Sequence, residues 1–188
     1  SSLSTVACGA TRTGGYVRTA AGSPGSWRTM SADCVVIAAL DEDRVIGDGG
    51  AIPWDIQDDL RRFRDLTIGN PVIVGRKTWE SMPKLDGREV VVISKSLTLS
   101  DVGDGEHLVW SIAEALELAD RLSDGQYFVA GGASIYEQFL DQGFVDRMEL
   151  TLVEGEHEGD KRFPEWDDSE WTCEYLEQRN GYKYVTLE

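Results

Sequence analysis

The side chain best placed to do chemistry is the carboxylate of Asp59. If a helix opens after Asp55, four residues recur at the spacing of an amphipathic stripe: Ile56, Asp59, Leu60 and Phe63. A charge buried without a partner is costly, so an acid on this stripe indicates a polar ligand as its partner. Alternatively, Asp58 and Asp59 are ordinary first-turn acids that interact with the helix dipole, with Asp55 as N-cap. The spacing alone leaves both interpretations open. The direction of the Asp59 pKa is also open, because desolvation raises it and the dipole lowers it.

Basic side chains gather just after this segment. Residues 61–95 hold eight arginines and lysines against four acids, in a chain whose net charge is −16. This local excess favours small anionic ligands such as phosphates or carboxylates, although a solvated face is the simpler alternative.

Glycine-rich turns follow three apolar segments. Gly75-Arg76-Lys77-Thr78 places cations at a helix start, where main-chain N–H groups bind phosphate. The turns at 47–50 and 131–132 are weaker signals, and none spells Gly-x-Gly-x-x-Gly. Three such turns at the ends of strands together indicate a nucleotide site.

Composition argues against several other functions. The 34 acidic residues outnumber 18 basic ones, which disfavours nucleic acid. The cysteines lie far apart without a CxxC pair and the two histidines are isolated, so neither a metal site nor a disulfide framework is expected. No apolar run approaches 18 residues and the start lacks the apolar core of a signal peptide, so no membrane association and a cytoplasmic location are expected.

The chemistry-bearing residues are set among alternating strands and helices. We expect strands at 34–40, 71–75, 90–94, 127–130 and 145–153, helices after Asp55 and at 76–82, 111–122 and 134–140, and a closing hairpin of 171–177 and 182–187. This order predicts an α/β fold of three layers, with a central, mainly parallel sheet of about eight strands, an antiparallel C-terminal edge and about four flanking helices. Residues 1–30 contain no acid and no periodicity, so we expect a disordered or non-native extension, with the domain at 31–188.

From about Cys34 to the end, the chain resembles dihydrofolate reductases, in a halophilic, haloarchaeal version. The shared motifs occur in family order: Ile37-Ala38-Ala39-Leu40, Asp43-Arg44-Val45-Ile46-Gly47, Ile52-Pro53-Trp54, Asp58-Asp59-Leu60 with Phe63, Pro71 to Ser81, Gly131-Gly132-Ala133-Ser134-Ile135-Tyr136, and Glu158-Gly159-Asp160 with Phe163-Pro164. The scarcity of lysine within an acid excess is similar to proteins of a salt-rich cytoplasm.

The resemblance implies NADPH-dependent reduction of 7,8-dihydrofolate to tetrahydrofolate for one-carbon metabolism, by hydride transfer to C6 and protonation at N5, in a monomer. It makes Asp59 the catalytic carboxylate. The substrate residues it implies are Ile37, Ala39, Asp59, Phe63, Arg64, Met82, Arg88, Tyr136 and Thr151, with Arg88 on the substrate's glutamate carboxylate and Lys84 as another helper. The NADPH residues it implies are Ala39, Ile46, Gly47, Gly50, Gly75, Arg76, Lys77, Thr78, Ser94, Lys95, Gly131, Gly132, Ala133, Ser134 and Ile135, and the Gly131-Gly132 bond is expected to be cis.

Two other functions compete with this one. A pyrimidine reductase of riboflavin synthesis would share the fold and NADPH, but the combination of Pro53-Trp54, Asp59 and Arg88 favours folate. A catalytically silent nucleotide-binding or scaffolding protein is disfavoured by the presence of both Asp59 and Arg88.

Overall fold

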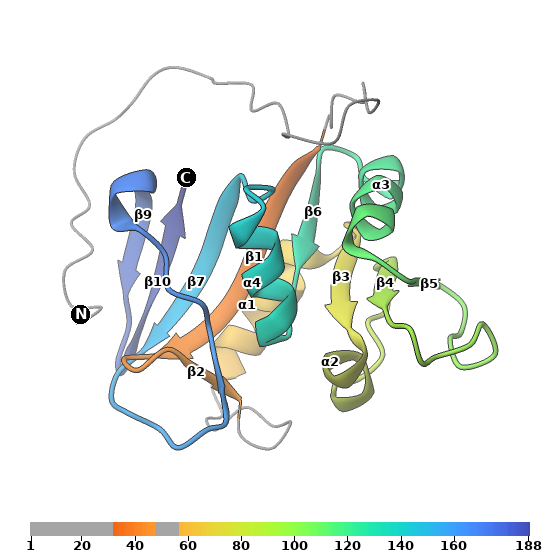
Figure 1. Ribbon diagram of the computed structural model, residues 1–188. Helices are drawn as coiled ribbons and strands as arrows, with labels where there is room; N and C mark the ends of the chain where they lie inside the picture. Colours follow the sequence, from red (N-terminus) through yellow and green to blue (C-terminus); the bar gives the residue numbers. More distant parts are fainter. Residues whose placement is uncertain (1–31, 48–56) are drawn as a thin grey trace.

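A mixed sheet of eight strands forms the centre of the computed structural model, which describes residues 32–47 and 57–188 (Figure 1). The strands of this sheet are β1 (Asp33–Asp41), β3 (Val72–Gly75), β4 (Val90–Ile93), β5 (Glu106–Val109), β6 (Gln126–Val129), β7 (Arg147–Val153), β9 (Cys173–Gln178) and β10 (Tyr182–Leu187). Two further strands, β2 (Val45–Gly47) and β8 (Lys161–Arg162), form a small sheet of their own. The helices are α1 (Gln57–Thr67), α2 (Arg76–Ser81), α3 (Ile112–Leu122) and α4 (Ala133–Asp141), with a 3₁₀ turn, η2, at Asp168–Glu170.

The sheet order is β5-β4-β3-β6-β1-β7-β10-β9, and β2 and β8 pair separately. From β5 to β7 neighbouring strands run parallel, whereas β10 is antiparallel to both β7 and β9. Parallel strands need crossover connections, which the four helices supply except between β4 and β5, where residues 94–105 connect the strands without a helix. The last two strands need only the tight turn at Gly181, where φ is 87°. The predicted three-layer α/β fold with an antiparallel C-terminal edge is confirmed.

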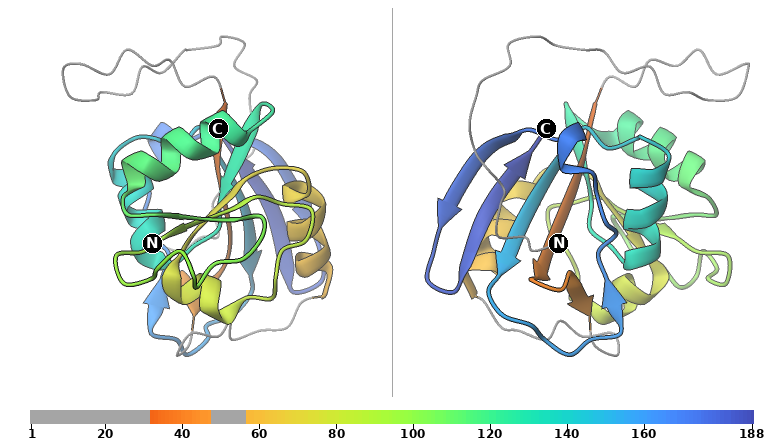
Figure 2. Two further views of the ribbon diagram at one scale, coloured as in Figure 1. Left: turned by 90° about the vertical axis from the view of Figure 1, so that its right-hand side faces the viewer. Right: turned by 60° about the vertical axis from the view of Figure 1, so that its left-hand side comes forward.

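Both faces of the sheet are covered because its central strands are apolar on both sides. On one face, α3 and α4 pack over Val36, Leu40 and Leu150. On the other, Phe63 of α1 and Trp79 of α2 pack against a smaller cluster around Ile37. In Figure 1 α4 lies in front of the sheet and α1 behind it, and the left view of Figure 2 shows the sheet between them.

Several local predictions are confirmed and others need adjustment. Ser111 caps α3 as expected, accepting a hydrogen bond from the Glu114 amide at 3.2 Å. Strand β5 was not expected, because its four residues include a glutamate and a histidine and only Val109 is buried. The Gly131-Gly132 peptide bond is cis, as the resemblance implied. Among the described residues no helix is both long and apolar enough to cross a membrane.

Candidate functional site

The carboxylate of Asp59 lies between α1 and the sheet. It is half-buried on the first turn of α1, and the Thr151 hydroxyl of β7 donates a hydrogen bond to its Oδ1 at 2.5 Å. Burial raises the pKa of Asp59, and the Thr151 hydrogen bond and the charge of Arg62 offset only part of that rise. Asp59 is therefore a partly desolvated acid, held in place from the sheet, and burial outweighs the effects that lower its pKa.

The stripe on which Asp59 was predicted differs in the structure. Leu60 is 55% exposed, so the prediction that it faces the core was wrong, and Ile56 lies outside the described residues. The inward side of α1 is instead formed by Asp59, Arg62, Phe63, Leu66 and Thr67, while Leu60 and Arg64 are exposed. The inward residues therefore follow the i, i+3, i+4, i+7, i+8 spacing of an amphipathic helix that starts from Asp59 rather than from Ile56.

Apolar residues expected to contact substrate gather near Asp59. Ala39 pairs with Thr151 across β1 and β7, and Ile37 pairs with Glu149 two residues earlier on both strands. Phe63 and Met82 pack, partly exposed, against the cluster that contains Ile37. A shelf of apolar side chains therefore adjoins the carboxylate.

Tyr136 approaches the same region from the other face of the sheet. Its ring is buried in the core under α4, and its hydroxyl donates to the Ile37 carbonyl oxygen at 2.7 Å. Burial and the nearby Asp59 charge raise the pKa of Tyr136, so its phenol stays protonated. It can hold the middle of β1 in place rather than act as a base.

Two arginines lie at the opposite end of α1 from Asp59. Arg88 donates to the Thr67 hydroxyl at 3.2 Å, and its guanidinium carbon lies 5.9 Å from the centre of the Phe63 ring. Burial, together with the charge of Arg64, lowers the pKa of Arg88. Cations that repel one another in this way favour a shared anion, such as a carboxylate, between or beside them. Lys84 is exposed.

The turns after β3 and β6 meet at the carboxyl end of the sheet. The Gly75 amide donates to the Gly131 carbonyl at 2.8 Å. A Cβ added at Gly132 would come within 3.2 Å of the Thr78 hydroxyl, and one at Gly75 would come equally close to Ile135. Glycine keeps backbone amides accessible here, as a phosphate-binding turn requires.

Other residues expected to bind cofactor have their own partners. Arg76 forms an exposed ion pair with Glu80 at 3.3 Å, while Lys77 is exposed. The Ser94 hydroxyl, buried, accepts from the amides of Ser96 and Leu97 at 3.1 Å. At the start of α4, Ala133 is the first helical residue, and the Ser134 hydroxyl accepts a hydrogen bond from Gln138 at 3.0 Å. Lys95 is exposed, whereas Ile46 packs on the core and Gly47 is the last residue of β2. Gly50 lies outside the described residues.

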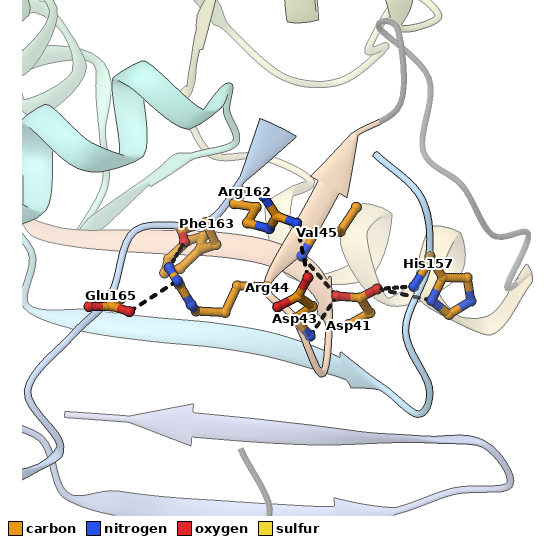
Figure 3. A network of polar contacts seen from close by, with 8 residues as sticks. All are labelled: Asp41, Asp43, Arg44, Val45, His157, Arg162, Phe163 and Glu165. Carbon is orange, nitrogen blue, oxygen red and sulfur yellow. Dashed lines mark hydrogen bonds and ion pairs between the residues drawn. The ribbon is translucent and has the colours of Figure 1, made fainter. Parts of the chain in front are cut away.

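A polar network that the sequence did not reveal braces β2 (Figure 3). Asp41, fully buried, accepts from the amides of Asp43 and Val45 at 2.9 and 2.8 Å, and from the amide and Nδ1 of His157 at 2.6 and 3.1 Å. Nearby, Arg162 pairs with Asp43 at 2.9 Å, and Arg44 donates to the Phe163 carbonyl at 2.6 Å and to Glu165 at 3.1 Å. Asp41 at the end of a long apolar strand was the available signal for a buried acid. Its partner His157 could not be identified because it lies far away in the sequence.

A second group that the sequence did not single out is Arg62 with Glu149. Their side chains pair at 2.9 Å across α1 and β7, one helical turn beyond Asp59. Glu149 could have been noticed as an acid inside an apolar strand.

Comparison with known proteins gives a consistent result. The family model described as dihydrofolate reductase matches residues 33–187. Dihydrofolate reductase HdrB of Haloferax volcanii is 38% identical over 161 residues, which cover 82% of each chain. Dihydrofolate reductase of Bacillus subtilis (strain 168) is 33% identical over 157 residues, 80% of this chain and 90% of that one. Among solved structures, dihydrofolate reductase from Enterococcus faecalis complexed with NADP(H) and RAB-propyl superposes with a TM-score of 0.73 at 28% identity, covering 84% of this chain and 96% of that one.

Proposed function

Because the chain belongs to the dihydrofolate reductase family and is an NADPH-dependent oxidoreductase that reduces dihydrofolate, we propose that Asp59 is its catalytic carboxylate. The observation that carries this proposal is the desolvated position of Asp59, fixed by Thr151 beside an apolar shelf. A negative charge in such a place stabilises a cationic pterin, and so favours protonation at N5.

When bound, NADPH would supply the hydride for C6 of the pterin. The residues present fit it, since Gly75, Gly131 and Gly132 leave open a backbone cradle beside the Thr78 hydroxyl that a Cβ would narrow. We propose that these glycines and Thr78 bind its pyrophosphate and that Arg76 and Lys77 bind phosphate. The start of α4, at Ala133 to Ile135, lies beside the cradle, and Ile46, Gly47, Gly50, Ser94 and Lys95 remain proposed cofactor residues.

The substrate would lie along α1. Asp59 stands in its first turn and Arg64 in its last, about 7.5 Å apart along the axis for five residues. We propose that the pterin contacts Asp59, Ile37, Ala39 and Thr151, that Phe63 and Met82 contact the middle of the substrate, and that Arg64 and Arg88 bind a terminal carboxylate. Tyr136 would act indirectly, because its hydroxyl donates a hydrogen bond to the Ile37 carbonyl oxygen from the opposite face of the sheet.

We also propose the bounds of the enzyme's domain, its oligomeric state and its location in the cell. The reductase unit is residues 31–188, supported by a family match that starts at residue 33. With a net charge of −16 it binds no nucleic acid, and it acts as a monomer in the cytoplasm. The family match disfavours a pyrimidine reductase of riboflavin synthesis. Turnover of dihydrofolate with NADPH would also exclude a catalytically inactive nucleotide-binding or scaffolding protein.

Replacing Asp59 by Asn tests the catalytic assignment. Asparagine keeps the size and an oxygen for Thr151 but loses the charge, so turnover of dihydrofolate at pH 7, followed by loss of NADPH absorbance, should fall by roughly 10²-fold, the scale of a group assisting proton transfer. Part of the loss should return at lower pH, because solvent then protonates the substrate.

The matched control is Asp58→Asn. Asp58 is the exposed neighbour on the same turn, held by Tyr182 at 3.0 Å and Arg61 at 3.6 Å, and its loss should leave turnover near wild type. A folded Asp59→Asn enzyme with wild-type turnover and an unchanged pH profile would refute the assignment.

A further inference from the structure

We propose that the ion pair between Arg62 and Glu149 positions Asp59 for proton delivery, which makes Arg62 a positioning residue of the reaction. The inference rests on the proposed role of Asp59. It concerns two side chains that connect the same helix and strand as Asp59 and Thr151.

The geometry is that of two adjacent contacts joining α1 to β7. Asp59 and Arg62 are three residues apart on the helix, and so lie on one side of it. Thr151 and Glu149 are two residues apart on the strand, and so share one face of the sheet. The Thr151 hydroxyl reaches Asp59 at 2.5 Å, and Arg62 Nη2 reaches Glu149 Oε2 at 2.9 Å. The second contact therefore limits rotation and sliding of the helix turn that carries the first.

Two residues of β10 contact the ion pair between Arg62 and Glu149. The guanidinium carbon of Arg62 lies 4.4 Å from the centre of the Tyr184 ring, a cation–π distance. The Thr186 hydroxyl donates to Glu149 Oε2 at 2.7 Å. Register places Tyr184 beside Thr151 and Thr186 beside Glu149, so the four strand residues form one block on the face that α1 covers.

The pair is too buried to be a solvated surface bridge. The side chains of Arg62 and Glu149 are 16% and 9% exposed. Arg147 lies 3.1 Å from Glu149 Oε1 but without an aligned hydrogen bond, so it adds charge more than direction. Arg62 is therefore the partner that orients Glu149 toward the helix. Removing Glu149 would leave the buried Arg62 without its counterion, whereas removing Arg62 would leave Glu149 with the charge of Arg147 alone.

Several charged and titratable groups face Asp59, and Arg62 is the one whose charge holds its pKa down. Arg62 of α1, Tyr184 of β10 and Tyr136 of α4 interact with Asp59 directly. Asp58 of α1, which Tyr182 of β10 contacts, is its neighbour in the chain, and Glu149 of β7 lies beyond Arg62. The Arg62 charge opposes the burial that raises the pKa of Asp59. Losing a nearby cation raises the pKa of every group that it faces, whether carboxylate or bound pterin.

The test compares Arg62→Met with Glu149→Gln in the full-length enzyme. Both variants remove the ion pair between α1 and β7, so the Asp59 carboxylate should be held less accurately. A misplacement near 1 Å can cost up to about 10²-fold, and we expect kcat to fall about tenfold in each variant. KM for NADPH should stay unchanged. The midpoint of the pH profile should move up in Arg62→Met, which loses a cation, and down in Glu149→Gln, which leaves that cation without its counterion. A purely structural role would lower the melting temperature without moving the midpoints apart.

The control is Arg61→Met, because Arg61 is the 78%-exposed neighbour on the same helix. If a single variant fails to fold, Arg62→Met/Glu149→Leu replaces the buried pair by apolar volume, which proteins tolerate well. In that double variant, wild-type kcat and an unmoved midpoint would overturn the proposal.

Combining Arg62→Met with Asp59→Asn separates this inference from the proposed function. The Arg62 effect on kcat should disappear once Asp59 has lost its charge, and its persistence there would show a role unrelated to Asp59. If Asp59→Asn alone keeps full activity, the proposed function fails. If Asp59→Asn is impaired but the Arg62 and Glu149 variants behave as wild type, only the inference fails.

Discussion

Asp59 is held at a cost to the stability of the fold. Burial dominates its environment, and the Thr151 hydrogen bond and the Arg62 charge do not cancel it, so its folded-state pKa lies above the ordinary 3.8. A carboxyl whose pKa is raised by folding favours the native state while it is protonated. That contribution is present below the ordinary pKa and is lost as pH rises through the folded pKa, so at neutral pH the ionised group destabilises the enzyme.

Asp59→Asn should therefore be more stable than wild type at pH 7. Asparagine cannot ionise, so the variant avoids the desolvation of a charge while keeping an acceptor for Thr151. Thermal melts should show the advantage growing as pH rises above the ordinary pKa of 3.8 and vanishing below it. Asp58→Asn, at an exposed site on the same turn, serves as control. A difference in melting temperature that does not depend on pH would contradict this linkage.

At the scale of elements, patterns local in sequence predicted more than patterns that depend on tertiary contacts. The capping box at Ser111 and the hairpin turn at Gly181 use neighbouring residues only, and both are found. The side of α1 that faces the sheet is decided by β7, which lies far along the chain, so the sequence placed Leu60 inward when it is exposed. For the same reason Asp59 was found from its spacing, whereas Glu149 and His157 became informative only through their partners.

The turn between β3 and α2 carries a test of cofactor choice. If Arg76 and Lys77 bind phosphates, replacing both by alanine should weaken NADPH far more than NADH, by tenfold or more, since charge-assisted hydrogen bonds contribute about 1.5–3 kcal/mol each. Dissociation constants for both cofactors provide the measurement.

Glu80 offers the matched control for that turn. It pairs with Arg76 at 3.3 Å, so Glu80→Gln releases the guanidinium and should bind NADPH at least as tightly as wild type. An equal loss of NADPH and NADH in the alanine variant would refute the phosphate assignment.

For the whole molecule, the alternation of apolar segments was enough to predict the layers and the order of parallel then antiparallel strands. A buried strand in a parallel sheet is apolar on both sides, as in Val90–Ile93, and that is readable without contacts. Strand β5, at the sheet edge, is half-solvated and gives no such signal. The contacts that sequence could not reveal join polar side chains more than 80 residues apart, as in Asp41 with His157 and Arg62 with Glu149.

The charge of the whole molecule leads to a final prediction about salt. Acids outnumber bases by 34 to 18, so many carboxylates have no cation to pair with and repel one another. Salt also weakens attractive surface pairs such as Arg162–Asp43, but exposed pairs contribute little. Repulsion should therefore dominate, and screening should stabilise the fold: as KCl rises from about 0.01 M, where the Debye length is about 30 Å, the melting temperature should increase. For a domain of this size the gain is about 2–4 °C per kcal/mol of repulsion removed. Choline chloride at matched ionic strength should reproduce the initial rise if screening is the cause, whereas a melting temperature independent of salt would mean that the surface charges are too far apart to repel significantly.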